Sequence, residues 1–266
     1  MKKISVLIFI ALTACTTSQK NTQTTTTTKP ISVDGKMFAS LFQQRAAEYK
    51  ALCFQAYNIA TLRLNEALQQ TNTKPLAVVT DIDETMLDNS PYAVHQSLLN
   101  KDYDLVSWME WTAKSSADTL AGAKTFFSYA SSKNVEVFYI TNREEKERAG
   151  TLKNLQLFGF PFADEAHLIT KQTTSSKETR RQTVSATHEI VLFLGDNLSD
   201  FSNLFDKKTE AERLQNVQSN ASLFGKKFIV LPNPSYGDWE SALYKYNYNL
   251  TSAQKDSVIK ASLKTY

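Results

Sequence analysis

Residues 78–85 read VVTDIDET, so two valines and a threonine run directly into the acidic residues Asp81, Asp83 and Glu84. The short apolar run at 76–80 predicts a buried strand, because strands covered on both faces are continuously apolar. Burying a carboxylate is costly unless it is paired or binds a cation. We therefore expect these acids to stand at the end of a strand, where they serve chemistry and not packing.

Three more apolar runs follow this strand along the chain, and stretches with helical periodicity separate them. The apolar runs are residues 135–141, 190–194 and 228–231, and the amphipathic stretches are 119–132, 144–157, 176–187 and 210–224. Continuous apolar strands joined by helices predict an α/β fold with a Rossmann-like parallel sheet that is covered on both faces. Such sheets hold their ligands at the carboxyl ends of the strands.

Two segments lie outside this alternation. Apolar residues recur at helical spacing across residues 37–68, which predicts a long N-terminal helix. Residues 87–118 match no single period and carry Trp108 and Trp111 among polar residues, which favours a small helical cap over the ligand site.

Each of the first three strands leads into polar residues that are able to perform chemistry. The first runs into DIDET at 81–85, the second ends in TNR at 141–143, and the third in GDNLSD at 195–200. Because the carboxyl ends of parallel strands meet at one edge of the sheet, these clusters should converge. Carboxylates gathered there raise each other's pKa unless a cation lies among them. An all-oxygen set of this kind suggests Mg²⁺.

The order of these motifs resembles that of the haloacid dehalogenase-like phosphohydrolases. The strings DIDETMLDNSPYA, FYITNR and GDNLSDF are similar to those of the class C bacterial acid phosphatases, lipoproteins that act on nucleoside monophosphates. The resemblance covers about residues 37–250. It implies a haloacid dehalogenase-like core and phosphomonoester hydrolysis. Each acid alone would more simply be a turn or helix-cap residue, but four motifs in order, each at a strand end, favour chemistry.

The resemblance implies a role for each residue of the motifs. Asp81 would be the nucleophile and form an aspartyl-phosphate. Asp83 would be the general acid and base, while its backbone carbonyl binds metal. Asp196 would be a direct metal ligand, and Asp200 would hold the metal through water or orient its neighbours. Thr141 would donate a hydrogen bond to a phosphate oxygen.

The remaining catalytic role requires a lysine that offsets negative charge on the nucleophile and the phosphoryl group. Lys177, which opens a predicted helix in a K-x-x-R pattern similar to the family's, is favoured over Lys171. Asn142 and Arg143 would shape the rim of the site.

The cap and the loops should decide which phosphomonoester is bound. Trp108 and Tyr236 are candidates to stack on a base or a nicotinamide ring, and Tyr92 would line the same mouth; ordinary packing aromatics are the alternative. The leading hypothesis is a Mg²⁺-dependent phosphatase for 5′-nucleotides, including nicotinamide mononucleotide. A phosphotransferase and a non-catalytic surface or haem-binding lipoprotein are the competing readings.

The N-terminus has the features of a secretory leader. Residues 1–14 combine two lysines with a short apolar run and predict a signal peptide. LTAC at 12–15 resembles a bacterial lipobox, in which Cys15 is lipidated; an ordinary cleavable signal is the alternative. The polar, Thr-rich residues 15–35 predict a flexible tether, and residues 36–266 the phosphatase domain. Thr16 resembles the outer-membrane-sorted class, which predicts a lipid-anchored protein of the bacterial outer membrane.

The charge balance sets a limit on the partners. The chain has 30 Lys and Arg against 27 Asp and Glu, with no basic stripe, so we expect no nucleic-acid partner. Apart from Cys15 the only cysteine is Cys53, which reads as a buried, inert thiol. A homo-oligomer is compatible with the sequence.

Overall fold

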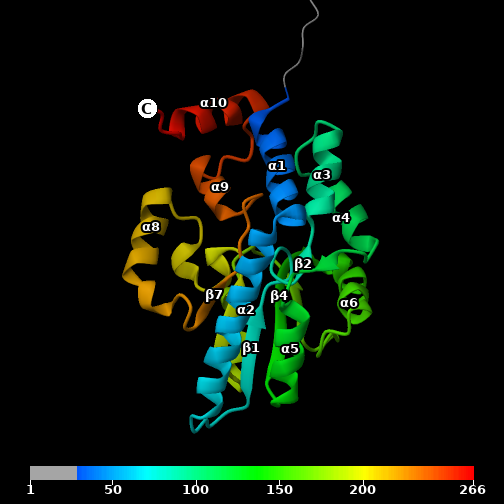
Figure 1. Cartoon of the computed structure of the whole chain (residues 1–266), viewed down its shortest axis with the longest axis vertical. Coiled ribbons are helices and arrows are strands. Elements are labelled where there is room, and N and C mark those ends of the chain that lie inside the picture. The colour runs from blue at the N-terminus through cyan, green and yellow to red at the C-terminus, as the bar shows by residue number, and fades with distance from the viewer. Residues whose placement is uncertain (1–28) are drawn as a thin grey trace, which may run out of the picture.

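The computed structural model describes residues 29–266, and its centre is a five-stranded sheet with strand order β5-β4-β1-β6-β7 (Figure 1). All neighbouring strands are parallel, which confirms the predicted fold class. The strands are β1 (Leu76–Thr80), β4 (Glu136–Glu144), β5 (Leu168–Lys171), β6 (Glu189–Gly195) and β7 (Phe228–Val230). Strand β5 was not expected, because only its first three residues, LIT, are free of charge and they adjoin polar residues on both sides.

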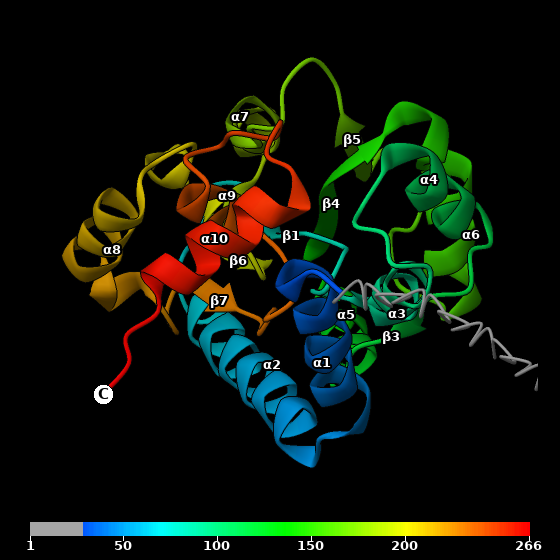
Figure 2. The ribbon, with the colours of Figure 1, turned by 90° about the horizontal axis from the view of Figure 1, so that it is seen from above.

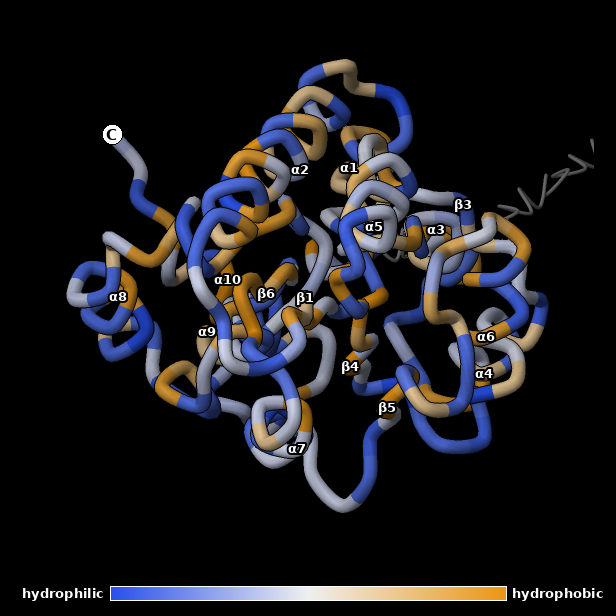
Figure 3. The backbone as a smooth tube through the Cα atoms, turned by 90° about the horizontal axis from the view of Figure 1, so that it is seen from below, coloured by the Kyte–Doolittle hydropathy of each residue, from blue (hydrophilic) through white to orange (hydrophobic). Residues whose placement is uncertain are grey.

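Helices cover both faces of the sheet, so the strands form an apolar centre that Figure 3 shows from below. Alternate residues of one strand serve the two faces: Val78 packs in one core cluster and Val79 in the other. The cluster around Val78 lies under α2, α5 and α6, and the second lies under α7. These helices are α2 (Ala47–Leu68), α5 (Ala123–Ser132), α6 (Arg148–Leu157) and α7 (Glu178–Thr187); a further helix, α8 (Glu210–Ser219), precedes β7 along the chain.

The N-terminal helical region consists of two helices and not of one. Helix α1 (Ile31–Arg45) ends at Ala46, whose extended backbone (φ −77°, ψ 128°) turns the chain into α2. Residues 31–35, expected in the tether, therefore belong to a helix. The predicted signal peptide, Cys15 and the first part of the tether lie outside the described residues.

Two groups of short elements surround the carboxyl ends of the strands. The segment that we expected to form the cap contains β2 (Leu87–Asp88), α3 (Ser90–Leu98), α4 (Leu105–Ala113) and β3 (Asp118–Thr119). The C-terminal helices α9 (Asp238–Leu243) and α10 (Ser252–Ser262) lie over the sheet in the view from above (Figure 2). Helix α10 also contacts α1. Both ends of the described chain therefore lie together above the carboxyl ends of the strands.

A charged cluster joins the cap to these terminal helices. Asp102, in the cap, forms ion pairs with Lys36 of α1 and Lys255 of α10. The distances from its carboxylate oxygens to the two Nζ atoms are 2.6 Å and 2.8 Å. Lys36 Nζ also lies 3.6 Å from Glu240 Oε2 of α9. Burial alone would raise the pKa of Asp102, but the lysines outweigh it and lower the pKa to about 2.

Asp102→Asn should lower the free energy of unfolding by about 1–2 kcal/mol at neutral pH. Because the folded-state pKa lies below the unfolded value of about 3.9, the stabilisation is present above that pH and fades as the pH falls toward about 2. Urea unfolding at several pH values measures the difference between variant and parent. A difference that stays constant below about pH 3 would contradict an ionic origin. The exposed Asp118 offers a control, Asp118→Asn, which should change stability little.

Candidate active site

A pocket of about 630 Å³ opens above the carboxyl ends of the strands. Asp81, Lys177 and Asp196 lie at its floor, the cap supplies one wall, and the C-terminal segment supplies residues such as Tyr244. This is the edge of the sheet where the sequence places its polar clusters.

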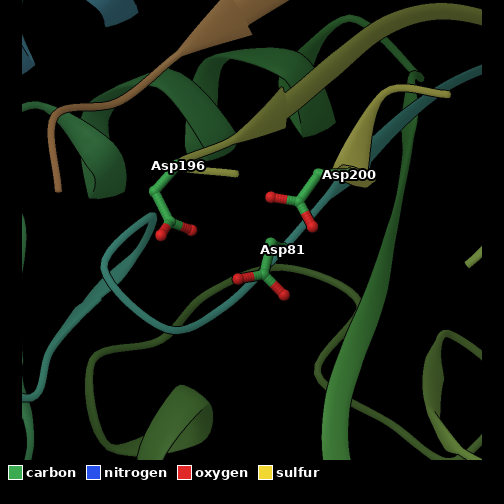
Figure 4. Close-up of side chains that lie close together, drawn as sticks. All are labelled: Asp81, Asp196 and Asp200. Atoms are coloured by element: carbon green, nitrogen blue, oxygen red, sulfur yellow. The ribbon is translucent and has the colours of Figure 1, made fainter. Parts of the chain in front are cut away.

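Three carboxylates meet at the floor. Asp81, Asp196 and Asp200 each offer an oxygen within 4.8 Å of the others, as Figure 4 shows. Asp81 follows β1, where its backbone N–H donates to Leu194 O of β6 at 2.9 Å. Asp196 follows β6 directly, and its carboxylate accepts hydrogen bonds from the Thr85 hydroxyl at 3.2 Å and the Asn233 amide at 2.8 Å. Neighbouring parallel strands thus bring these residues together.

The glycine of the GDNLSD motif permits this close approach. Asp200 is the last residue of a 3₁₀ turn (Leu198–Asp200). Its carboxylate accepts a hydrogen bond from the Asn197 N–H at 3.0 Å, and this bond holds the carboxylate against the end of β6. A Cβ atom on Gly195 would lie 2.7 Å from Asp200 Cγ. Any larger residue at this position would displace the acid.

Lys177 supplies the positive charge at the floor. It directly precedes α7, is 4% exposed, contacts Asp81 Oδ1 and lies 2.7 Å from Asp200 Oδ1. The other candidate, Lys171, is the last residue of the edge strand β5 and pairs instead with Glu144, the last residue of β4, at 2.8 Å. Of the two lysines that the sequence leaves open, the structure brings Lys177 to Asp81.

The electrostatics of the cluster favour a bound cation. Burial raises the pKa of Asp81 to about 7; Lys177 opposes this rise, while Asp200 and Asp83 add to it. Burial, followed by the charges of Asp200 and Asp81, raises the pKa of Asp196 well above its usual range. One ammonium does not balance three carboxylates, and oxygens so placed are the donors that hard divalent cations prefer. The cluster therefore fits a divalent metal ion.

Asp83 lies apart from this cluster. Its carboxylate binds the Arg143 guanidinium, with Nη2 at 2.7 Å and Nε at 3.1 Å, and accepts from the Asn89 amide at 2.8 Å. Arg143, expected at the rim, is 2% exposed and forms a buried ion pair beneath the rim. The Asp83 side chain is therefore held by Arg143 and Asn89 and is not one of the three clustered carboxylates.

Thr141 and Asn142 differ in their access to the pocket. Thr141 is fully buried, and its Oγ accepts a hydrogen bond from Arg143 N–H at 3.1 Å, so its hydroxyl proton is free to donate elsewhere. Asn142 lines the pocket, and its side-chain oxygen accepts from Arg180 Nη2 at 2.7 Å.

The predicted aromatic residues all line the pocket. Tyr92 and Trp108 of the cap pack edge to face with ring centroids 5.1 Å apart, and Trp108 also lies 5.9 Å from the Arg143 guanidinium carbon. Tyr236 enters from the C-terminal segment. Tyr103, which the sequence reasoning missed, lies 6.1 Å from Trp108 and is 56% exposed. The pocket mouth is thus more aromatic than the motifs indicate.

Glu84 lines the pocket, although the sequence motifs assign it no role there. It is 1% exposed, adopts a left-handed backbone (φ 52°), and accepts hydrogen bonds from the Tyr236 hydroxyl and, at 2.8 Å, from Asn89 N–H. Burial raises the pKa of Glu84 to about 8, with Asp83 adding to the rise. The only signal in the sequence is its place within the motif DIDET, directly after Asp83.

Comparison with known proteins identifies the family of this chain. The sequence-family model for the HAD superfamily, subfamily IIIB (acid phosphatase), matches residues 3–239. The structure is similar to the class C acid phosphatase from Bacillus anthracis, with a TM-score of 0.85 and 42% identity, covering 88% of this chain and 99% of that one. A structure of the Bacillus anthracis enzyme with tungstate bound gives the same TM-score and identity, covering 88% and 98% of the two chains.

A curated relative, acid phosphatase 1 from Solanum lycopersicum, is 30% identical over 128 residues, which are 45% of this chain. The chain spans about half the length of this relative, 49%. The family match and the Bacillus anthracis structures, by contrast, extend over most of the chain. The chain therefore belongs to subfamily IIIB of the HAD superfamily, the acid phosphatases.

Proposed function

We propose that this protein hydrolyses phosphomonoesters through an aspartyl-phosphate, an acyl phosphate formed on Asp81. The observation that carries the proposal is the placement of Lys177 between Asp81 and Asp200 at the floor of an open pocket. Membership of the acid phosphatase subfamily supports it. The tungstate complex of the Bacillus anthracis relative supports it as well, because tungstate is a tetrahedral oxyanion like phosphate.

In the proposed reaction, an Asp81 oxygen attacks phosphorus and the ester oxygen leaves as an alcohol after taking a proton from Asp83. Asp83 then removes a proton from a water molecule that attacks the phosphorus of the aspartyl-phosphate. This step releases inorganic phosphate and restores the Asp81 carboxylate. Lys177 stays charged throughout and offsets the charge on the phosphoryl oxygens. Thr141 donates a hydrogen bond to one of these oxygens.

The carboxylates of Asp81, Asp196 and Asp200 fit Mg²⁺, because all of the donors are oxygens at one strand edge. Mg²⁺ bound there would supply a positive charge that favours binding of the phosphate dianion. Asp83 would contribute its backbone carbonyl to the same ion.

We propose 5′-nucleotides, including nicotinamide mononucleotide, as the substrate class. Tyr92, Trp108 and Tyr236 line the pocket together with Asp81, so a phosphate at the floor leaves a base among aromatic side chains. Stacking on such side chains contributes about 1–3 kcal/mol per base and tolerates different bases.

We further propose that the protein is anchored by a lipid on Cys15 at the outer membrane. The leader and the lipobox-like sequence at 12–15 support this proposal. Within residues 29–266 the structure contains no helix that combines the length and apolarity required to cross a membrane.

Removal of divalent metal tests the proposed function. EDTA should reduce hydrolysis of 5′-nucleotides by roughly 10²-fold or more, and added Mg²⁺ should restore it. The assay measures phosphate release from nucleotides, sugar phosphates and phosphoserine at acidic and neutral pH. Addition of an alcohol acceptor, with analysis of the products, separates hydrolysis from phosphotransfer. Full activity of the metal-stripped protein would contradict the proposal, and a preference for sugar phosphates would contradict the substrate class.

A further inference from the structure

Helix α7 carries two consecutive arginines whose side chains reach two different loops of the site. Arg180 and Arg181 are 5% and 4% exposed. They follow Lys177 by three and four residues, so one helix start presents the lysine and both guanidinium groups to the carboxyl edge of the sheet. The proposed reaction assigns no role to either arginine.

Arg180 binds the end of the second motif. Its Nη1 donates to Thr141 O at 2.6 Å, and its Nη2 donates to Asn142 Oδ1 at 2.7 Å and to Ser176 O at 3.1 Å. The guanidinium thus connects the residues before α7 to the backbone that carries the Thr141 hydroxyl. This is the segment expected to bind a phosphate oxygen.

Arg181 binds the loop of the last motif instead. Its Nη1 donates to Ser199 O at 2.8 Å and to Asp200 O at 2.9 Å, and its Nη2 pairs with Glu178 at 2.7 Å. The two carbonyls belong to the short 3₁₀ turn that ends at Asp200. Arg181 therefore fixes the backbone that carries one of the three clustered carboxylates.

A purely structural contact between a helix and a sheet would not require this pair. Val184 of the same helix already packs in the core beneath it. Two adjacent buried guanidinium groups carry like charges and a desolvation penalty that apolar side chains avoid. A guanidinium, however, presents five N–H donors in a fixed planar arrangement, so it can hold several oxygens of different segments in set directions, which an apolar residue cannot do.

We propose that Arg180 and Arg181 are positioning residues that act separately, Arg180 on the phosphate-binding segment 141–142 and Arg181 on the metal-binding turn at 199–200. This inference rests on the proposed function, since it takes the roles of Thr141 and Asp200 from it. It predicts a separation of effects between two neighbouring residues.

Arg181→Gln should weaken Mg²⁺ binding by about 10–100-fold, while KM at saturating Mg²⁺ stays close to that of the parent. Arg180→Gln should leave Mg²⁺ binding nearly unchanged and weaken binding of inorganic phosphate on the order of 10-fold or more. Calorimetry measures Mg²⁺ binding without substrate and phosphate binding at saturating Mg²⁺. Initial rates with p-nitrophenyl phosphate give KM and kcat.

Two further sets of variants complete the experiment. Gln182→Ala is the matched control, because Gln182 is the next residue, is exposed, and its side-chain amide donates a hydrogen bond to Glu178 at 3.1 Å and to neither loop; it should change neither binding constant. Arg180→Lys and Arg181→Lys retain the buried charge, should fold where the glutamine variants do not, and should recover part of the lost binding at their own loop. Equal losses of Mg²⁺ and phosphate binding in both arginine variants would overturn the proposal. Calorimetry measures binding without turnover. An inactive parent protein would therefore refute the proposed function, while the effects of the variants on Mg²⁺ and phosphate binding could still be measured.

Discussion

Asp81→Asn should abolish turnover of p-nitrophenyl phosphate, with a loss on the order of 10⁴-fold or more, as for removal of other enzyme nucleophiles. The amide of asparagine cannot form the acyl phosphate on which the proposed reaction depends. The fold should be retained, because burial disfavours the charge at this position and raises the pKa of Asp81 to about 7. Initial rates measure the loss, and circular dichroism checks the fold.

The control for this variant is Asp118→Asn, the same change at an exposed aspartate of β3 that lies outside the pocket lining. It should keep the activity of the parent. A second check is acid quenching with a labelled phosphomonoester, which should trap phosphate on the parent and none on the Asp81 variant. Activity above about a tenth of the parent's in the Asp81 variant would exclude Asp81 as the nucleophile.

The positions of the strand ends were predictable, because the carboxyl ends of parallel strands all lie at one edge of the sheet. The run at 76–80 became β1 without adjustment of its bounds. Once β1 and β6 are parallel neighbours, Asp81 and Asp196 must lie at the same edge. Residues 87–118 match no single period, and the structure places two short helices and two short strands there.

Features that depend on tertiary contacts were not predictable in this way. The apolar spacing continues through Ala46, so nothing local indicates the extended residue that separates α1 from α2. This break turns α1 toward the cap, where Gln43 donates to Asp88 at 2.7 Å. The part played by α9 and α10 in covering the site likewise follows from long-range packing, with Lys255 reaching Asp102 across 153 residues of sequence.

The partners of the polar residues beneath the site were also not predictable from the sequence. Arg143 reads as a rim residue because it follows the strand-end threonine, but its side chain turns inward to Asp83. Glu84 reads as the first-turn charge of a helix, but a left-handed backbone directs it to Tyr236. In both cases the partner is more than 50 residues away in the sequence, so a local pattern cannot identify it.

The choice between Lys177 and Lys171 leads to the second large effect. Lys177→Met should reduce kcat on the order of 10³-fold, because it removes the charge that offsets the phosphoryl oxygens. It should also lower the free energy of unfolding of the metal-free protein by about 3–5 kcal/mol, since Asp81 and Asp200 lose a buried partner. Added Mg²⁺ should recover part of this stability but little of the activity. Rate measurements and urea unfolding with and without Mg²⁺ test both effects.

Lys171→Met provides the decisive comparison, because the two variants make the same chemical change six residues apart. Lys171 pairs with Glu144 and its side chain is 32% exposed, so its loss removes a surface ion pair and should alter stability by less than about 1 kcal/mol. Activity should be unchanged, because no part of this pair borders the pocket.

The opposite result, an inactive Lys171 variant and an active Lys177 variant, requires residues 171–177 to move so that Lys171 replaces Lys177 at Asp81. That rearrangement would withdraw Arg180 and Arg181 from their loops as well, so the lysine pair also tests whether the start of α7 acts as one rigid unit.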